Sequence, residues 1–517
     1  MKSRIYFFYG LLLIGLMILL GRAAQLQIIF GWRNREIAEG NRIKKVILPA
    51  PRGIIYDRKG RALVRNIPIY RKCQSLNVKT QNCEQISREE ALKIEAKGGH
   101  EAESVRVDVG REYVYGEVLT HLLGYLGEAS EKEVGSGKYQ LGDLVGRGGV
   151  EEKYDSWLRG KDGGEVFEVN AFGEKIREIG IEQPTPGKDL YLNIDAELSK
   201  IAFEALERKK GAVVATEVKT GAVLVLVSSP SFNPEKITPE ILTDKNQPLF
   251  NRAVAGLYPP GSTFKIVTAT AGLEEGKIDA NTLYEDTGEI RVGNWVYKNW
   301  YFTQYGKTEG EINVVGALKR STDTFFYKVG EWVGASRLAQ WAGAFGFGKP
   351  TGIDLPVEGE GKVPDPSTGQ WFLGNTYHFA IGQADLLTTP LQVNMMASVI
   401  ANNGRLCRPF ITHSLGINCQ DLQLKPETLR LVKEGMEEAC SPGGTAFPLF
   451  NFQPAVACKT GTAEFGDPAG RTHAWLTAFA PADEPEIVVT ALVEAGGEGS
   501  RVAAPIVKKV MEEWFGR

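Results

Sequence analysis

The first strong pattern along the chain is an uncharged, apolar run at residues 5–20, which follows Lys2 and Arg4. A helix that spans a membrane needs about 20 apolar residues, although roughly 17 suffice, and residues 23–24 can extend this run. A cleaved signal peptide begins in the same way, but Gly21-Arg22-Ala23 is a poor cleavage site because of its arginine. We therefore expect an uncleaved single-pass anchor at residues 5–24, behind a cytoplasmic tail at residues 1–4.

Beyond the anchor, the hydrophobic pattern changes twice. A polar region runs from about Gly31 to Asp189, rich in Gly, Glu and Lys, with short strand-like runs, and Thr185-Pro186-Gly187 marks a boundary. A strand at residues 190–194 follows, and apolar residues then recur at helical spacing over residues 198–206, behind the candidate N-cap Asp195. Residues 211–227 predict one hairpin, and residues 472–480 with 487–493 predict another. Strands at both ends with helices between them favour an α+β domain at residues 190–517, with a central antiparallel sheet covered by helices.

Length and composition fit this division. A chain of 517 residues exceeds one hydrophobic core and suggests two or three units. Hydrophobic residues make up 43% and charged residues 24%, as in ordinary globular proteins. The net charge of -3 provides no basic field, so we expect no nucleic-acid partner.

Candidate chemistry begins at residues 258–265, which read YPPGSTFK. The two prolines prevent an earlier helix start, Gly261 permits a tight approach, and a helix is predicted from about Ser262. Residues three apart share a helix face, so the Ser262 hydroxyl and the Lys265 amine can meet. The helix N-terminus adds free N–H groups where an oxyanion would form. This pattern predicts serine acyl transfer with a lysine base.

Two later motifs supply partners in the right order. Ser321-Thr322-Asp323 offers a hydroxyl to relay protons and a side chain to hold a substrate amide. Lys459-Thr460-Gly461-Thr462 reads as an outer strand, whose lysine and hydroxyls suit a carboxylate-bearing ligand and whose glycine admits a substrate backbone. A second Lys-Thr-Gly, at residues 219–221, lies between two apolar runs, and we interpret it as a hairpin turn.

Together these motifs resemble the Ser-x-x-Lys, Ser-x-Asn and Lys-Thr-Gly triplet of the penicillin-binding and β-lactamase superfamily. The resemblance extends over nearly the whole chain to class B penicillin-binding proteins, and residues 258–265 and 323–327 are similar to their elongation branch, penicillin-binding protein 2. Further matching segments are residues 51–60, 121–125, 146–151 and 158–160 in the polar region, and 351–356, 389–392 and 473–475 beyond it. The resemblance implies an elongated, mostly β pedestal (dimerisation-like) domain at residues 25–189 and a transpeptidase domain at residues 190–517.

The resemblance also implies a mechanism and assigns roles. Neutral Lys265 takes the Ser262 proton, and Ser262 attacks the penultimate D-Ala of a peptidoglycan stem peptide. Backbone N–H groups of Ser262 and Thr462 form the oxyanion hole, and Ser321 relays the proton to the departing D-Ala. The terminal carboxylate is bound by residues 459–462, namely Lys459, Thr460, Gly461 and Thr462. An amine of a neighbouring stem peptide then completes the cross-link, and a β-lactam traps the acyl-enzyme.

Location and partners are likewise implied. Arginines at positions 22, 33 and 35 leave the anchor's orientation open by charge alone, but stem peptides are outside the cell, which places Lys2 and Arg4 inside. The resemblance implies work in cell-wall elongation and cell shape. It also implies a multi-spanning glycosyltransferase of the shape, elongation and division (SEDS) family and other elongation-complex proteins as partners. No cofactor is implied.

Three departures from the family pattern bear on these expectations. Asp323 stands where the general motif has Asn, and a carboxylate beside Lys265 would favour the charged amine, so Asp323→Asn should acylate equally fast or faster. Gly382-Gln383-Ala384 lacks a second glycine, which would alter a turn, and the short stretch at residues 57–111 implies a reduced head region. Some relatives bind zinc between the first two motifs through Asp, His and Cys, but residues 263–320 contain neither His nor Cys, so no metal is expected.

Other residues that could take part in chemistry have structural interpretations. Six cysteines allow 15 pairings, of which Cys73–Cys83, Cys407–Cys419 and Cys440–Cys458 are nearest neighbours, and buried free thiols are the alternative. Packing is the favoured role for three histidines, His121, His378 and His473. It is also favoured for Trp295, Trp300 and Tyr301, for which the alternative is that they line a substrate groove.

Alternative functions share the motifs. A D,D-carboxypeptidase or β-lactamase would use water as acceptor, although the long pedestal argues against both. A β-lactam sensor would need a cytoplasmic domain, for which four residues before the anchor leave no room. A catalytically inactive scaffold of the wall-synthesis complex is a third possibility.

Overall fold

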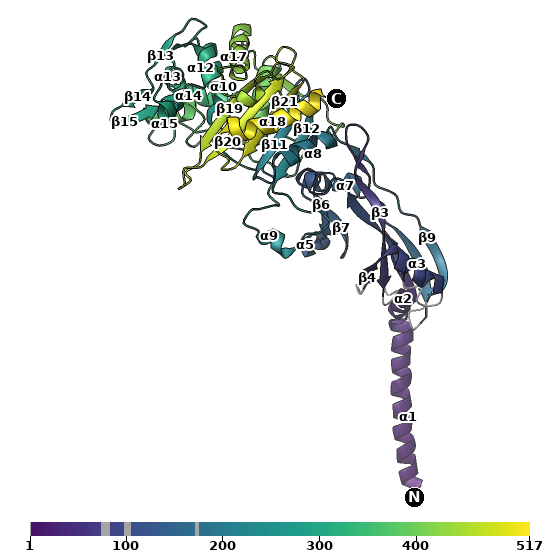
Figure 1. Ribbon diagram of the computed structural model, residues 1–517. Coiled ribbons are helices and arrows are strands. Elements are labelled where there is room, and N and C mark those ends of the chain that lie inside the picture. Colours follow the sequence, from purple (N-terminus) through teal and green to yellow (C-terminus); the bar gives the residue numbers. More distant parts are fainter. Residues whose placement is uncertain (1, 74–82, 98–104, 171–174, 517) are drawn as a thin grey trace. The chain divides into compact units, whose positions relative to one another are not determined.

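The computed structural model describes residues 2–73, 83–97, 105–170 and 175–516 (Figure 1). Two compact units interleave along the chain: the first comprises Met1–Gly53, Asn66–Arg111 and Ser156–Lys188, and the second Ile54–Arg65, Glu112–Asp155 and Asp189–Arg517. The predicted domain bounds of 25–189 and 190–517 stay predictions.

The first unit begins with a long apolar helix, α1 (Lys2–Ala24), which continues through one π-helical turn, η1 (Gln25–Ile29). Together they are long and apolar enough to cross a membrane, and none of their most apolar window is buried in the protein. This matches the predicted anchor. Next come α2 (Gly31–Arg42) and a three-stranded antiparallel sheet in the order β1 (Ile43–Leu48), β8 (Gly163–Val169) and β9 (Lys175–Glu182). The small helix α3 (Arg88–Lys97) packs its buried Ala91 and Ile94 on Ile86 of β4 (Cys83–Ile86).

The long strands β3 (Ala62–Cys73) and β5 (Val105–Tyr113) contribute residues to both units. In the second unit, short elements precede the main sheet: β2 (Ile55–Tyr56), α4 (Thr120–Leu123), β6 (Tyr125–Glu128), α5 (Glu131–Gly135), β7 (Leu144–Arg147), α6 (Gly149–Lys153) and β10 (Leu190–Tyr191). The helix α7 (Asp155–Leu158) crosses from one unit to the other.

A five-stranded antiparallel sheet forms the centre of the second unit. Its strand order is β12 (Val223–Ser229), β11 (Gly211–Glu217), β21 (Ile487–Val493), β20 (Thr472–Ala480) and β19 (Ala457–Glu464). Both predicted hairpins are confirmed, and β19, which carries the third motif, is an edge strand as predicted. The outer edge of β19 therefore keeps backbone groups available for pairing with another chain.

Helices cover both faces of this sheet. On one face lie α8 (Ala196–Ala205) and α18 (Gly499–Phe515), which pack on each other and on the strands (Figure 1). The helix α16 (Pro390–Ala401) packs on β11, β20 and β21. The predicted N-cap is confirmed, since the Asp195 carboxylate accepts the Leu198 N–H at 3.1 Å. The α+β architecture with a helix-covered antiparallel sheet is therefore confirmed.

The remaining α-helices of this unit include those that carry the first two motifs. They are α10 (Lys265–Glu274), α11 (Trp300–Tyr305), α12 (Val314–Arg320), α13 (Asp323–Val333), α14 (Ala335–Ala344), α15 (Leu373–Ala380) and α17 (Pro426–Ala439), with the short α9 (Pro239–Thr243). Small strand pairs join them: β13 (Tyr284–Asp286) with β16 (Gly310–Ile312), β14 (Glu289–Val292) with β15 (Trp295–Lys298), and β17 (Arg405–Cys407) with β18 (Cys419–Asp421).

Two of the three nearest-neighbour cysteine pairs are disulfides. Cys407–Cys419 closes the β17–β18 hairpin, and Cys440–Cys458 joins the end of α17 to the start of β19. Cys73 and Cys83 are paired positions of β3 and β4, but their side chains lie outside the described residues.

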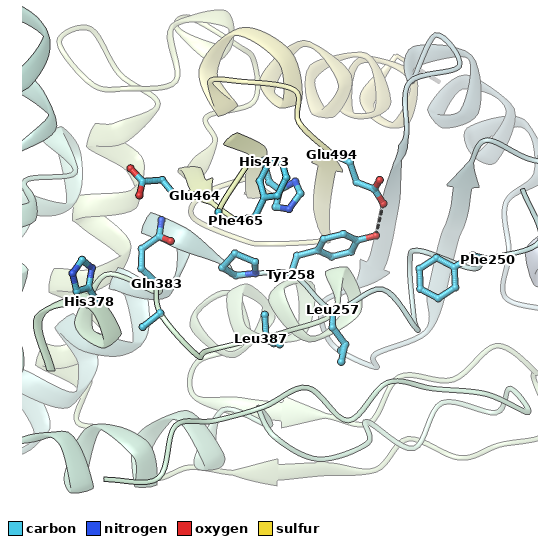
Figure 2. A pocket seen from close by; sticks show the side chains of 13 residues that line it. Phe250, Leu257, Tyr258, His378, Gln383, Leu387, Glu464, Phe465, His473 and Glu494 are labelled. Atoms are coloured by element: carbon cyan, nitrogen blue, oxygen red, sulfur yellow. Dashed lines mark hydrogen bonds between the residues drawn. The ribbon is translucent and has the colours of Figure 1, made fainter. Parts of the chain in front are cut away.

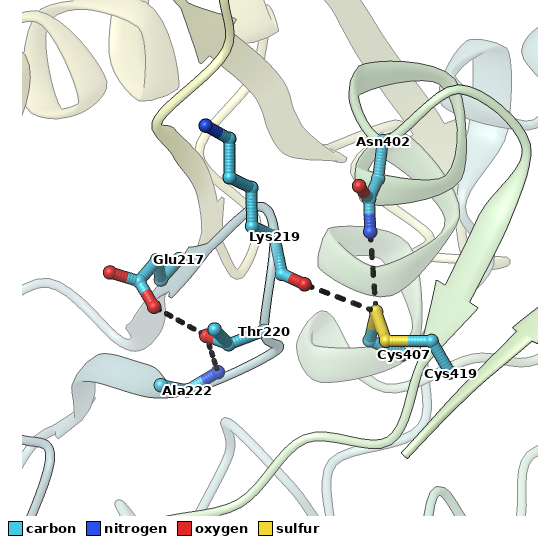
Figure 3. Close-up of a disulfide and its surroundings, with 7 residues drawn as sticks. All are labelled: Glu217, Lys219, Thr220, Ala222, Asn402, Cys407 and Cys419. Carbon is cyan, nitrogen blue, oxygen red and sulfur yellow. Dashed lines mark hydrogen bonds between the residues drawn. A yellow bond between two sulfur atoms is a disulfide. The ribbon is translucent and has the colours of Figure 1, made fainter. Parts of the chain in front are cut away.

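The Lys219-Thr220-Gly221 sequence is a turn, as predicted. It lies between β11 and β12, where the Thr220 hydroxyl donates to Glu217, and the Cys407 sulfur lies 3.9 Å from the Lys219 carbonyl oxygen (Figure 3). A disulfide sulfur carries no hydrogen, so this approach is a packing contact. It places the second Lys-Thr-Gly beside a disulfide, in the turn between β11 and the edge strand β12, whereas the third motif lies on β19 at the opposite edge of the sheet.

Candidate active site

Ser262 lies in a 3-10 turn, η4 (Gly261–Phe264), and the α-helix α10 starts only at Lys265. The helix was predicted to start near Ser262; in the structure, the tighter turn comes first. The turn is held from both sides, since Trp475 Nε1 donates to the Pro259 carbonyl at 3.0 Å and Gly261 N to the Gly382 carbonyl at 2.8 Å. Gly261 has φ +54°, a left-handed conformation that favours glycine, and a Cβ there would lie 3.0 Å from the Thr462 carbonyl oxygen.

Lys265 is completely buried beneath this turn, and its amine is fully engaged. It donates to Asp323 Oδ1 at 2.6 Å, to the Ser321 carbonyl at 2.7 Å and to Ser321 Oγ at 3.3 Å. An ammonium has three protons, and these acceptors take all of them. Among the described residues, the expected hydrogen bond between the Ser262 hydroxyl and Lys265 is therefore not present. The geometry is that of a charged amine held in an ion pair.

Ser321 lies between two lysines. It ends α12 in a left-handed conformation with φ +56°, unusual for a residue with a side chain, and it is 6% exposed. Its Oγ accepts from Lys459 Nζ at 2.8 Å and from Lys265 Nζ at 3.3 Å. Because this oxygen accepts from both amines, its own proton remains to be donated. The arrangement suits a proton relay.

Burial dominates the electrostatics of both lysines. It lowers the pKa of Lys265 below the ordinary value, and the Asp323 carboxylate opposes this effect. Burial, together with the charge of Lys265, lowers the pKa of Lys459 still further, again against Asp323. Two completely buried amines thus share one nearby carboxylate, which favours the neutral form for at least one of them.

The third motif separates into buried and exposed residues along β19. Lys459 is completely buried and Thr460 is 8% exposed, with the Thr460 hydroxyl bonded to the Thr445 hydroxyl at 2.8 Å. Thr462 is exposed. Gly461 is buried, and a Cβ there would lie 2.9 Å from the Trp475 Cβ and 3.1 Å from the Pro260 carbonyl oxygen. The packing of η4 and β20 therefore already requires glycine at this position, whatever a substrate adds.

A groove of about 770 Å³ opens beside these motifs, although Ser262 does not line it (Figure 2). Its lining includes Glu464 and Phe465 at the end of β19, Gln383 from the turn that contacts η4, and Tyr258, four residues before Ser262. The Tyr258 hydroxyl donates to Glu494 at 2.7 Å, which is the dashed line in Figure 2. Apolar walls with a few polar groups are typical of ligand sites.

The packing predictions for histidines and aromatic residues have mixed outcomes. His473 stacks on Phe465 with ring centres 4.1 Å apart, and burial lowers the pKa of His473 to about 4. His121 is buried against the Pro248 carbonyl, so both have packing roles. His378 is exposed and lines the groove, and the ring of His473 lines it as well, which the prediction missed.

The aromatic insert before the second motif also differs from the prediction. Trp295 is 73% exposed, so the packing interpretation is wrong for it, because the β14–β15 hairpin carries it outward. Trp300 packs as predicted, with its Nε1 donating to the Arg320 carbonyl and its backbone N–H to Asp323. Sequence reasoning missed the buried polar groups around Asp323, which no motif marks. The described residues contain no group of three or more His, Cys, Asp or Glu side chains that could hold a metal ion.

Fold and site together define a serine-type acyltransferase of the penicillin-binding kind. Residues 211–512 match the family "Penicillin binding protein transpeptidase domain", and residues 69–192 match "Penicillin-binding Protein dimerisation domain". The chain therefore belongs to the penicillin-binding protein transpeptidase family, in the class B, elongation-type branch called penicillin-binding protein 2.

Individual relatives agree over the full length. The peptidoglycan D,D-transpeptidase MrdA of Acinetobacter baumannii is 33% identical, over 99% of this chain and 88% of the relative. Penicillin-binding protein 2 of Helicobacter pylori, solved in complex with MreC, gives a TM-score of 0.80 at 28% identity, covering 92% of this chain and 99% of that one. A structure titled for the coordination of polymerization and crosslinking by a peptidoglycan synthase complex gives 0.81 at 32% identity, covering 100% and 99%.

Proposed function

We propose that this protein is a peptidoglycan D,D-transpeptidase of cell-wall elongation that acts through an acyl-enzyme on Ser262. The observation that carries the proposal is the convergence of three motifs: the partly exposed Ser262 lies above Lys265, and Ser321 Oγ links Lys265 to Lys459. These residues come from three separate elements, η4–α10, the α12–α13 junction and β19.

Acylation begins with loss of the Lys265 proton, which burial promotes. The neutral amine then takes the Ser262 proton as the Ser262 oxygen bonds to the carbonyl carbon of the penultimate D-Ala. The developing oxyanion accepts from the backbone N–H groups of Ser262 and Thr462. The C–N bond to the last D-Ala breaks, and its nitrogen receives a proton through Ser321. An acceptor amine later attacks the ester, and Ser262 regains its proton.

The substrate's terminal carboxylate is bound at β19 with a division of labour. Thr462 is the exposed hydroxyl of the motif, so it makes the direct contact. Lys459 is completely buried and contacts Ser321, so it contributes positive charge from beneath the strand. Thr460 fixes the strand through Thr445.

The rest of the donor peptide adds to the free edge of β19 as an extra strand. Residues that precede D-Ala-D-Ala then lie in the groove that Glu464, Gln383 and Phe465 line. This path keeps the scissile carbonyl over Ser262 while the groove holds the remainder of the stem peptide.

The apolar helix α1 supports a location in the cell membrane. In this proposal, Lys2 and Arg4 lie inside and the catalytic unit lies outside, because stem peptides are outside the cell. The partners are proteins of the elongation complex. This is supported by the relative solved with MreC and by the relative titled as part of a peptidoglycan synthase complex. A SEDS-family glycosyltransferase would supply the glycan strands.

The test is labelling of the full-length protein in detergent with a fluorescent penicillin. Wild type should give a covalent band, Ser262→Ala no band, and Lys459→Ala a weak one. Ser336→Ala, a serine in the first turn of α14, is the matched control and should label like wild type. No band from folded wild type would overturn the proposal. Incubation with donor and acceptor peptides then distinguishes a cross-linked product from simple release of D-Ala, the carboxypeptidase outcome.

A further inference from the structure

Asp286, at the end of β13, is a buried carboxylate outside the three motifs. It is 1% exposed and accepts four hydrogen bonds, two on each oxygen. The donors are Thr324 Oγ1 at 2.6 Å, Asn299 Nδ2 and Glu309 N at 2.9 Å, and Gly288 N at 3.0 Å. These donors belong to the segments before and after the second motif, so one side chain ties them together. A buried carboxylate with every lone pair engaged is rigid.

Asn299 links Asp286 to Asp323 through hydrogen bonds. The Asn299 side chain is completely buried; its nitrogen donates to Asp286, and its oxygen accepts the Asp323 backbone N–H at 3.1 Å. The next residue completes the link, because Trp300 N donates to Asp323 Oδ2 at 3.0 Å. The Asn299–Trp300 segment therefore holds both the backbone and the side chain of Asp323. The other carboxylate oxygen of Asp323 is the one that meets Lys265 at 2.6 Å.

We propose that Asp286 and Asn299 are positioning residues, which hold the Asp323 carboxylate against Lys265 without touching the substrate themselves. This inference rests on the proposed function, since Lys265 is the base of that reaction. Trp300 adds a second brace, because its indole N–H donates to the carbonyl of Arg320, next to Ser321. The insert between the first two motifs thus holds the second motif in position.

The direction of the expected effect follows from the groups around Lys265. Two charged groups face it, Asp323 from α13 and Lys459 from β19, and the Tyr327 phenol on α13 also interacts with Asp323. If Asp323 loses its braces, its carboxylate is no longer held beside Lys265. Burial then lowers the pKa of Lys265 with less opposition, so the amine is neutral at a lower pH.

The experiment measures the rate of acylation by a fluorescent penicillin against pH for the full-length protein. In Asn299→Ala, the acid limb of the profile should move to lower pH, the direction that Asp323→Asn gives. Unlike in Asp323→Asn, where the side chain keeps its place beside Lys265, the whole Asp323 side chain can move in Asn299→Ala, so the rate at the optimum should fall about tenfold or more, since a shift of roughly 1 Å in a catalytic group can cost about 100-fold. Combining the two substitutions should move the limb no further than Asp323→Asn alone, because both act through one contact.

Asn394→Ala is the matched control. Asn394 is also completely buried, with hydrogen bonds on its oxygen and its nitrogen, but it packs under the central sheet away from the motifs. Its loss should lower the melting temperature and leave the acid limb in place. If Asn299→Ala does not fold, Asp286→Asn keeps the side-chain shape and should move the limb in the same direction.

An unmoved limb in folded Asn299→Ala or Asp286→Asn would overturn the inference, and so would an equal movement in Asn394→Ala. Failure of the proposed function looks different, because wild type itself would then not be acylated at Ser262.

Discussion

Replacing Asp323 by asparagine tests how the protein sets the charge of Lys265, the proposed base. Asp323 Oδ1 lies 2.6 Å from the amine of the completely buried Lys265. Asparagine keeps the shape and an acceptor oxygen but removes the charge. The effect of burial is then no longer opposed by this carboxylate, and the pKa of Lys265 falls further below its ordinary value. More of the amine is neutral near pH 7, so acylation should be equal to or faster than in wild type.

The size of the effect on stability can be estimated from the same contact. At 2.6 Å and an effective dielectric constant of about 20, the attraction between the two charges is roughly 6 kcal/mol, and desolvation offsets much of it. Breaking a buried pair typically costs about 3–5 kcal/mol while the remaining charge persists. Here Lys265 escapes most of that cost by losing its proton. We therefore expect a smaller loss at pH 7, with a marked dependence on pH.

The sign of that dependence follows from proton binding. The folded state lowers the pKa of Lys265 below 10.5, its ordinary value, so the unfolded chain binds more protons in between. The free energy of unfolding therefore rises with pH from the folded pKa up to the unfolded one. Asp323→Asn lowers the folded pKa further, which widens this window. Its stability should climb more with pH than that of wild type.

The assay combines acylation rates with thermal unfolding from pH 5 to pH 9. Asp354→Asn is the control: Asp354 is a buried carboxylate that accepts from Ile411 N and the Thr412 hydroxyl, far from the lysines in sequence and contacts. It should destabilise the fold without moving the acylation profile. A loss of acylation of about tenfold or more at every pH in Asp323→Asn would refute the reasoning, since it would show that the carboxylate itself is needed.

Two further predictions concern the frame of the site. Ala384 has φ +60°, a left-handed conformation that costs a non-glycine residue about 1–2 kcal/mol. After the conformational entropy of glycine is deducted, Ala384→Gly should stabilise the protein by about 0.5–1 kcal/mol. The control Ala469→Gly, at an exposed loop position, should not stabilise it, and thermal unfolding measures both variants. Replacing Cys440 and Cys458 by serines removes their disulfide and should lower the free energy of unfolding by roughly 3 kcal/mol in a denaturant titration. It should also slow penicillin labelling, because Cys458 adjoins Lys459. The same change at Cys407–Cys419 should leave labelling unchanged, and equal slowing in both variants would contradict the prediction.

Local patterns predicted what depends on neighbours in sequence. The N-cap Asp195, both hairpins and the turn at residues 219–221 follow from spacing and turn chemistry, and each is present. The edge position of β19 and the nearest-neighbour disulfides 407–419 and 440–458 also match what the sequence favoured or allowed. The roles of Ser262, Lys265, Ser321, Asp323, Lys459 and Thr462 in catalysis stay predictions.

Features that depend on tertiary packing could not be predicted from the sequence. Residue spacing placed Lys265 within reach of Ser262, but the structure turns its amine to Ser321 and Asp323, because a buried ammonium takes the strongest acceptors available. Trp295 was expected to pack, but the β14–β15 hairpin exposes its side chain to solvent. Asp286 and Asn299 belong to no motif, and they lie 13 positions apart, so only the fold brings them together.

The placement of charge beneath β19 explains why the motif order alone describes this site incompletely. Two lysines that are both completely buried cannot both remain charged at little cost, and Asp323 offsets only one positive charge. Ser321 accepts from both amines, so a proton lost by one is compensated by a shift of hydrogen bonds to the other. Under the proposed function, a substrate carboxylate bound at the exposed Thr462 would add a negative charge to this group, which favours the charged form of both lysines. Because burial lowers the pKa of Lys459 further than that of Lys265, Lys459 is the amine that loses its proton more readily before a substrate binds, so the local charges rather than the motif order set which lysine is neutral.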